Sequence, residues 1–460
     1  MRSFVILGIR KQQMQGFPML NASLNHTVAA ARHRIVPCDS TTSSDSLECL
    51  SATMGFFDRF FGPPTEAKFA KLLTDTLHQA GDDRQVSYDP SQSQLVFTRD
   101  GKEAGVINLR NLFLEFGNVE TANRTAWLKR ICSGLVNQMD MPEDFEDVKP
   151  DLRPSVRSRS MLETLRIGAE GSSDKPTNVP WVPLSDDLII CLVYDLPNSI
   201  RFVMQKDLDI WGVSLYEAME VARRNLDENQ STMCASLGDK LHIFQSGDAY
   251  DGTRMLMLDL IRHLKVEGNP LALPITRDCL MITGTDDMEG QRMMVELAEK
   301  QLGEARPLCS IPHVLMGDEW TPWNPTEEHP QYQKYRLLER HHHGSEYAEQ
   351  KELLDKRNEK MGIDAYVVVY GAIKFEGQDC SYALWSKGVS SWLPKADLVA
   401  FFDSDTQVIK GFVPWEKAIK ELRPMMQPLD YWPPRWAVEE FPTDEQLEKM
   451  GARMPQPKSD

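Results

Sequence analysis

Hydrophobic positions early in the chain change from a helical period to a strand period. Phe69, Leu72, Leu73 and Leu77 follow a helical spacing, which predicts a helix that ends at Gly81. Shorter runs of alternating polar and apolar residues follow, and they predict three strands, QVSYD, QLVFTR and EAGVINL. The Asp-Gly pair at 100–101 predicts a hairpin turn between the last two strands.

A unit of two strands and a helix repeats three times between residues 183 and 316. The first two strands, DLIICLVYDL and IRFVMQ, predict a hairpin, and the helix after them begins at Ser214, where Glu217 completes a capping box. Few connections are long enough for parallel crossovers. Together with residues 64–167, this region therefore predicts an α+β fold of antiparallel sheets with helices packed on one face.

The last third of the chain is more polar at first. Residues 317–361 predict a helical polar linker, and residues 362–460 predict a small α+β domain with a helix over Lys417–Leu422. The tail PLDYWPPRWAVEEFP is rich in proline and aromatic residues, which predicts an extended strap. This strap either docks on its own domain or binds a partner protein.

Residues 1–53 differ from the rest of the chain. The stretch MGFFDRFFGPP from Met54 is typical of a second start, so we expect residues 1–53 to be disordered or to come from an over-extended start. A targeting peptide is the alternative, because residues 1–37 are basic without an acid and a serine-rich stretch follows.

Composition and charge argue against several kinds of partner. The 460 residues carry a formal net charge of -17, which repels phosphate backbones and argues against nucleic acid. The eight cysteines occur singly, without a CxxC pair, as is typical of reduced thiols in the cytoplasm. No apolar stretch reaches the length that a membrane span needs.

Four segments occur in the order in which a known family carries them: LRPSVRSRS, VYDLPNSIRFVMQKDLDIWGVSLYEAMEVARRNL, SGDAYDGTRML and LALPITRDCLMITG. Over about residues 66–316 the chain resembles the YtpQ-like family, a bacterial domain of unknown function. The resemblance implies a cytoplasmic bacterial protein without an assigned activity. Some relatives have glycine where this chain has Ala249, so a role that needs glycine there does not carry over.

The segment SGDAYDGTRML, residues 246–256, holds the main candidate site. A helix is expected to begin near Asp251, whose carboxylate would cap N–H groups of the first turn. Asp248 adds favourable negative charge at the same end, but Arg254 is unfavourable there unless an anion neutralises it. Either these groups pair with one another, or Asp248, Tyr250 and Asp251 act as polar or acid–base groups.

Two further arginines extend this candidate. Arg157 in PSVRSRS and Arg277 in PITRDCL each lie between apolar strand residues, where a guanidinium needs a partner such as Asp278 or Asp195. Alternatively, Arg157, Arg254 and Arg277 converge on a small carboxylate or phosphate, which guanidinium groups bind well.

No metal or cofactor site is predicted. His341, His342 and His343 are consecutive, so a helix would point them in different directions, and we expect solvation or adventitious metal affinity. Asp248 and Asp251 lack the ligand pattern of a calcium loop. The sequence also lacks the common motifs of nucleotide-binding proteins, serine hydrolases and zinc proteases.

Two functional classes remain. The first is a non-catalytic binding or scaffold protein that meets a protein partner through its carboxy-terminal domain. The second is a small-anion-binding protein or enzyme that uses the clustered arginine and aspartate residues.

Overall fold

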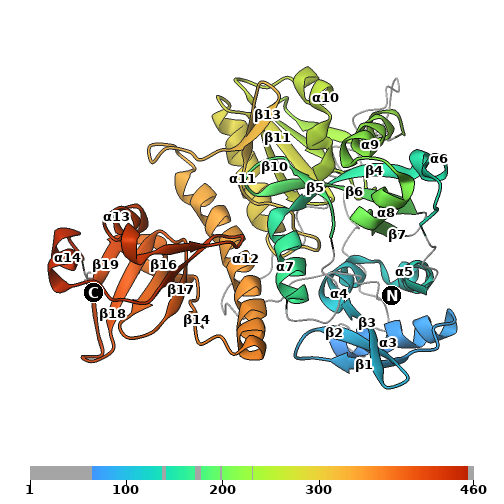
Figure 1. Cartoon of the computed structure of the whole chain (residues 1–460). Coiled ribbons are helices and arrows are strands. Elements are labelled where there is room, and N and C mark those ends of the chain that lie inside the picture. The colour runs from blue at the N-terminus through green and yellow to red at the C-terminus, as the bar shows by residue number, and fades with distance from the viewer. Residues whose placement is uncertain (1–64, 137–140, 171–177, 197–198, 230–231, 454–460) are drawn as a thin grey trace. The chain divides into compact units, whose positions relative to one another are not determined.

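The computed structural model describes residues 65–136, 141–170, 178–196, 199–229 and 232–453 (Figure 1). The predictions for residues 1–53 lie outside these ranges. The chain divides into two compact units. Unit 1 consists of Met1–Val156, Pro180–Pro183 and Ile190–Trp323, and unit 2 consists of Arg157–Val179, Leu184–Ile189 and Asn324–Asp460. Each unit is therefore assembled from three separate stretches of chain.

Unit 1 begins with a three-stranded antiparallel sheet and three helices. The elements are α3 (Glu66–Gln79), β1 (Gln85–Asp89), β2 (Gln94–Arg99), β3 (Lys102–Asn108), α4 (Leu109–Asn118) and α5 (Arg124–Val136). Phe69, Leu73 and Leu77 of α3 are buried, as their spacing predicts, but Leu72 of the same predicted stripe is 44% exposed. Asp100 and Gly101 both have positive φ and form the predicted turn between β2 and β3.

A second sheet of unit 1 has the order β4-β6-β5, with β7 paired to β6. Its strands are β4 (Leu152–Ser158), β5 (Trp181–Pro183), β6 (Leu188–Leu196) and β7 (Ser199–Phe202), and β4 and β6 each continue into unit 2. The pairing of β6 with β7 is antiparallel, as the hairpin pattern predicts. The predicted capping box is also confirmed: before α9 (Leu215–Asn229), the Ser214 N–H donates to Glu217 at 2.8 Å and the Glu217 N–H donates to the Ser214 hydroxyl at 3.2 Å.

The largest sheet of unit 1 has six antiparallel strands in the order β13-β12-β10-β11-β9-β8. They are β8 (Cys234–Leu237), β9 (Leu241–Phe244), β10 (Pro270–Thr276), β11 (Cys279–Gly284), β12 (His313–Met316) and β13 (Glu319–Pro322). Helix α11 (Met288–Gln301) packs on β9, β10 and β11 (Figure 1). Strand β13 lies inside the segment expected to be helical, because Gly317 turns the chain with a φ of 64° and returns it to β12.

Unit 2 combines two packed helices, α7 (Arg159–Ala169) and α12 (Tyr332–Met361), with two four-stranded sheets. The sheets have the orders β14-β17-β21-β20 and β15-β16-β18-β19. Their strands are β14 (Tyr366–Val367), β15 (Gly371–Phe375), β16 (Gln378–Ser386), β17 (Ser391–Pro394), β18 (Leu398–Asp403), β19 (Val408–Pro414), β20 (Gln427–Leu429) and β21 (Arg435–Val438). The pairs β14–β17 and β16–β18 are parallel, and the others are antiparallel.

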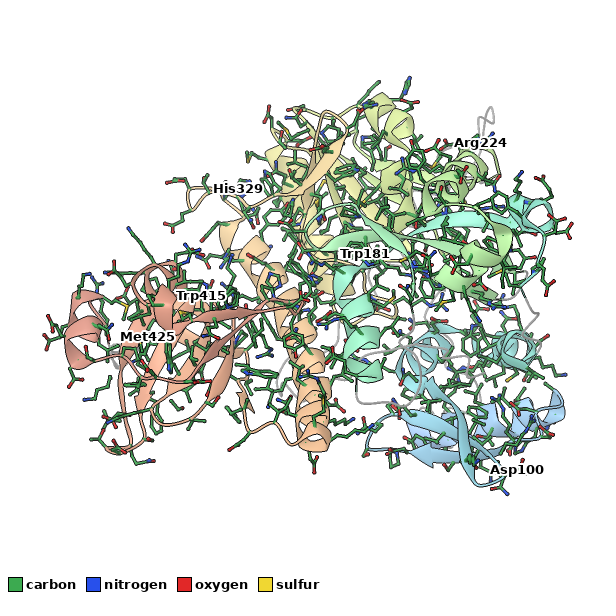
Figure 2. The ribbon with its side chains drawn as sticks, viewed as in Figure 1. Asp100, Trp181, Arg224, His329, Trp415 and Met425 are labelled. Atoms are coloured by element: carbon green, nitrogen blue, oxygen red, sulfur yellow. The ribbon has the colours of Figure 1, made fainter. Side chains whose placement is uncertain are left out.

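The proline-rich and aromatic tail lies on its own domain, where β21 pairs with β17, and it also contacts the two helices of unit 2. The Tyr347 hydroxyl of α12 donates to the Pro434 carbonyl at 2.9 Å. On the other side, the Arg159 guanidinium of α7 lies over the Trp432 ring, 4.1 Å from its centroid. Nearby, α13 (Trp415–Glu421) places Trp415 in the core of this unit (Figure 2).

Helices and largely antiparallel sheets in both units confirm the α+β fold class. The cysteines in the described ranges form no disulfide. Within the same ranges, no helix has both the length and the apolar character to cross a membrane.

Candidate functional site

The segment 246–256 does not begin a capped α-helix. Gly252–Leu256 forms a 3-10 helix, and the α-helix α10 (Leu258–His263) follows it. The Asp251 carboxylate makes no cap hydrogen bond, because Asp251 has a φ of -59° and a ψ of -46°, whereas an N-cap residue needs an extended backbone. Its oxygens instead accept the Ser246 N–H at 2.9 and 2.8 Å. The predicted cap is therefore wrong.

Arg254 lies at the centre of an ion-pair cluster. Its side chain is 0% exposed, with Nη2 2.6 Å from Oδ2 of Asp248 and Nη1 3.0 Å from Oδ1 of Asp251. Its Nε donates to the Thr232 hydroxyl at 3.2 Å. The cation that is unfavourable in this position is thus neutralised locally, in agreement with the ion-pairing interpretation.

The two carboxylates of this cluster differ in their pKa shifts. Burial raises the pKa of Asp248, but hydrogen bonds from Arg254 and from the Tyr250 N–H outweigh burial, and the pKa is lowered overall. Burial also raises the pKa of Asp251, and there it prevails over the Ser246 N–H and the Arg254 charge. The difference follows solvent access, since the Asp248 side chain is 30% exposed and the Asp251 side chain is fully buried.

Two other residues of the segment serve the backbone and the core. Ala249 has a φ of 69°, in the left-handed region that favours glycine. Tyr250, a candidate acid–base group, is buried and packs with Val193 and Leu226. The Tyr250 ring is therefore part of the core rather than of an open site.

The segment around Arg277 adjoins the first segment through the backbone. The Gly252 N–H donates to the Arg277 carbonyl at 3.1 Å, and a Cβ atom on Gly252 would lie only 3.3 Å from the Thr276 carbonyl oxygen. Glycine permits this close approach. Arg277 and Asp278 are half-buried between β10 and β11, and Nε of Arg277 is buried without a hydrogen-bond acceptor in the described ranges.

The three candidate arginines differ in their surroundings. Arg157 is buried in the part of β4 that belongs to unit 2, whereas Arg254 and Arg277 belong to unit 1. Arg254 is already enclosed by two carboxylates. Arg277 is therefore the arginine of this set that best suits a small anion.

A buried polar cluster in unit 2 has no counterpart in the sequence analysis. The hydroxyls of Ser158 and Ser160 donate to Oε1 of Glu346 at 2.9 and 2.5 Å. His342 Nε2 lies 3.4 Å from Oε1 of Glu346, and His343 Nδ1 lies 3.7 Å from its Oε2. His342 is buried, so the expectation of solvated histidines is wrong for this residue.

Electrostatics in this cluster favour a structural role. Burial raises the pKa of Glu346, but the neighbouring His342, His343 and Ser160 outweigh burial and hold the pKa well below its usual range. A carboxylate of low pKa is a weak base, so it does not activate Ser160 as a nucleophile. Burial together with the Glu346 charge raises the pKa of Asp187 to about 7. Over the described ranges, no group of three His, Cys, Asp or Glu side chains is suited to hold a metal ion.

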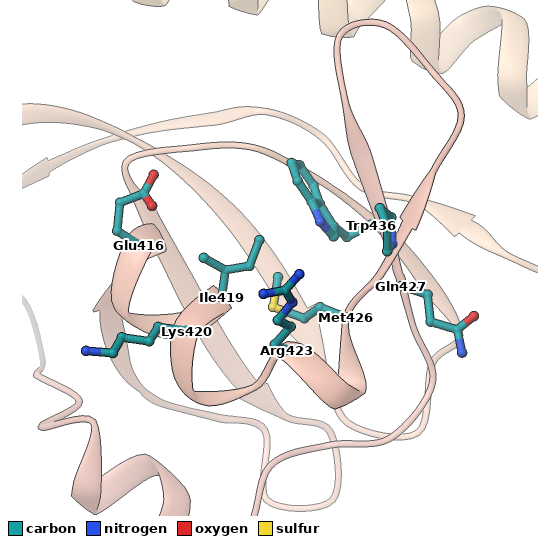
Figure 3. Close-up of a pocket in the computed structure, with 8 residues that line it drawn as sticks. Glu416, Ile419, Lys420, Arg423, Met426, Gln427 and Trp436 are labelled. Carbon is teal, nitrogen blue, oxygen red and sulfur yellow. The ribbon is translucent and has the colours of Figure 1, made fainter.

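An open groove of about 720 Å³ lies in unit 2 beside α13 (Figure 3). Its lining consists of Glu416, Ile419, Lys420, Arg423, Met426, Gln427, Pro428 and Trp436. The Trp436 ring packs edge-on against Trp415, with 4.9 Å between the ring centroids. Lys420 and Arg423 are exposed, and neither makes an ion pair with another described residue. The groove could not be predicted from the sequence, because α13, β20 and β21 come together around it only in the folded chain.

The chain matches no protein-family model, no curated protein and no solved structure. The resemblance to the YtpQ-like family therefore stays a prediction from the four segments.

Proposed function

We propose that this chain is a non-catalytic binding or scaffold protein of the bacterial cytoplasm that meets a protein partner through its carboxy-terminal domain, residues 362–460. The observation that carries this proposal is the enclosure of Arg254. The buried guanidinium of Arg254 pairs with the buried carboxylate of Asp251 and with that of Asp248, whose side chain is 30% exposed. Catalysis needs side chains that contact a substrate, whereas these side chains already contact one another.

The carboxy-terminal domain offers the opposite arrangement. Its groove is open, and the two cations in the lining, Lys420 and Arg423, make no ion pair with the described residues. Charges and apolar side chains that the fold leaves accessible in one concave surface are typical of a contact site. This contrast supports binding rather than catalysis.

The test selects a displayed library of random peptides on the immobilised full chain and then measures hydrogen exchange with an enriched peptide bound. We expect protection confined to residues 362–460. If no sequence is enriched, or if protection falls on residues 246–284 instead, the proposal fails.

A small carboxylate or phosphate bound at Arg277 is the second candidate function, because Nε of Arg277 is buried without an acceptor in the described ranges. Phosphate, phosphosugars, nucleotides and carboxylates are screened for an increase in the melting temperature, which bound ligand raises by mass action. The increase should be lost in Arg277→Ala and kept in Arg262→Ala, an exposed control. An absence of any shift across the set contradicts this candidate.

A further inference from the structure

The groove beside α13 joins an apolar floor to a cationic rim. Met426 is buried and Trp436 is half-buried, and both line the concave surface with Ile419. Figure 3 shows the Arg423 side chain, from the 3-10 turn after α13, reaching toward Ile419 and Met426, whereas the Lys420 side chain points outward from α13. An apolar side chain and a negative charge can therefore be accommodated side by side.

The rim selects for charge. Lys420 and Arg423 are exposed without an ion pair to the described residues, in a chain whose formal net charge is -17. A cationic rim attracts an acidic ligand and repels a basic one. Glu416 lines the groove as well, and its charge disfavours the continuous run of phosphates of a nucleic acid.

The neighbouring sheet edge favours recognition through side chains. Strand β20 lies at the end of its sheet, and its residues Gln427 and Pro428 line the groove. A strand of three residues with a central proline is a poor template for adding another strand, since proline has no N–H to donate. The aromatic and cationic side chains are then the groups that can hold an occupant.

The geometry points to an acidic segment of a partner protein as the occupant of this groove, with one apolar side chain against Trp436 and Met426 and its carboxylates beside Lys420 and Arg423. This inference rests on the proposed function and names the chemistry of the partner. A small anion alone would leave the apolar floor uncovered.

The test measures binding of three labelled synthetic peptides to the full chain by fluorescence anisotropy. In each peptide a leucine is flanked on both sides by glutamates, by glutamines or by lysines. The glutamate peptide is expected to bind most tightly and to weaken as salt is added. The exposed double substitution Lys420→Glu with Arg423→Glu should weaken it by at least about tenfold.

Two further variants test the position of the site and the contribution of its apolar contact. Lys417→Glu reverses an exposed charge on the same helix outside the groove and should leave binding nearly unchanged. Trp436→Ala should weaken the glutamate and the glutamine peptides alike, because it removes the apolar contact. Equal loss in Lys417→Glu, or no loss in the double variant, overturns the groove as the site.

A single-stranded oligonucleotide is the remaining probe. If it binds more tightly than the glutamate peptide and is lost in the double variant, the acidic-protein assignment is overturned in favour of nucleic acid. Failure at the groove with hydrogen-exchange protection elsewhere in residues 362–460 rejects this inference but leaves the proposed function standing. Protection confined to residues 246–284 rejects both.

Discussion

Arg254 of unit 1 and Arg435 of unit 2 are both fully buried, yet only one of them meets an opposite charge. Arg254 contacts the carboxylates of Asp248 and Asp251. Arg435 contacts neutral acceptors, and burial lowers its pKa to about 10. The comparison separates two requirements of a buried guanidinium: its N–H groups need acceptors, whereas its charge can be carried without a carboxylate in contact.

The neutral acceptors around Arg435 come from several elements of unit 2. Nη1 donates to the carbonyl oxygens of Val368 and Trp392 at 2.8 and 3.0 Å, and Nε donates to Oε1 of Gln350 at 2.5 Å. The guanidinium also lies 5.1 Å from the centre of the Tyr347 ring. Arg435 thus joins strand β21 to helix α12, whereas Arg254 closes a local loop.

The largest expected effect is at Arg254. Arg254→Met leaves the buried Asp251 without its cation, so the free energy of unfolding should fall by about 3–5 kcal/mol in a denaturant titration. Adding Asp251→Asn removes the stranded charge and should recover part of that loss.

Arg292→Met is the matched control for this prediction. The ion pairs of Arg292 with Glu289 and Glu296 lie at the surface, so its midpoint should not change. A midpoint that is unchanged or raised in Arg254→Met would mean that the cluster is kept for binding rather than for stability.

A smaller loss is expected at Arg435. Arg435→Met leaves neutral acceptors rather than a charge, and the Trp392 carbonyl keeps the Val368 N–H as a donor at 3.1 Å. The free energy of unfolding should therefore fall by about 1–3 kcal/mol. If the same titration shows a larger loss of unfolding free energy in Arg435→Met than in Arg254→Met, the proposed difference between the two arginines is wrong.

The buried carboxyl of Asp187 should make the stability of unit 2 depend on pH. Its pKa is raised from 3.8 to about 7 by burial first and by the Glu346 charge next, while His343 opposes the shift and Asp186 and Glu339 add to it. A carboxyl whose pKa rises on folding stabilises the fold while protonated, so stability is lost as the pH increases from about 4 to about 7.

Asp187→Asn tests this pH dependence, because asparagine does not ionise. The variant should be more stable than the wild type by at least about 1 kcal/mol above pH 7, since each pKa unit corresponds to about 1.4 kcal/mol. The two curves should converge below about pH 4. Asp186→Asn, at an exposed neighbouring position, is the control and should keep most of the wild-type pH dependence, because burial and the Glu346 charge contribute more to the shift than Asp186 does. If the stability of Asp187→Asn depends on pH as that of the wild type does, ionisation of Asp187 does not destabilise the fold.

The smallest effect is expected at Ala249, inside the loop that Arg254 closes. Its φ of 69° is costly for alanine and readily adopted by glycine. Ala249→Gly should therefore raise the free energy of unfolding by about 0.5–1 kcal/mol. A loss of stability would mean that a contact of the alanine methyl group stabilises the fold by more free energy than the backbone strain costs.

Local features of this molecule could be predicted from the sequence. The capping box of Ser214 and Glu217 spans three positions, and the pairing of Arg254 with Asp248 and Asp251 spans six and three positions. Such partners are close in space whatever the rest of the fold does. The helix cap predicted for the Asp251 carboxylate was nevertheless wrong, because the choice between a 3-10 helix and an α-helix depends on how the turn packs.

Partners that are distant along the chain could not be predicted. Ser160 and Glu346 are separated by 186 positions, and Arg435 is separated from Gln350 by 85. The contact of His342 with Glu346 spans only four positions of one helix, but nothing near these residues indicates that Ser158 and Ser160 will donate to the same carboxylate. The cationic groove likewise depends on the return of β21 beside α13, which periodicity does not encode.

Unit 2 is built from separate stretches of chain, so its parts are synthesised at different times. Glu163 of α7 accepts a hydrogen bond from the Trp432 N–H, 269 residues later. At about 5–20 residues per second a ribosome needs roughly 15–50 s to make the intervening chain. Throughout that interval the cluster that Ile167 of α7 forms with Leu354 and Val367 lacks Tyr431, the tail residue that packs against it. The nascent chain therefore carries an early helix that only its last-made segments complete.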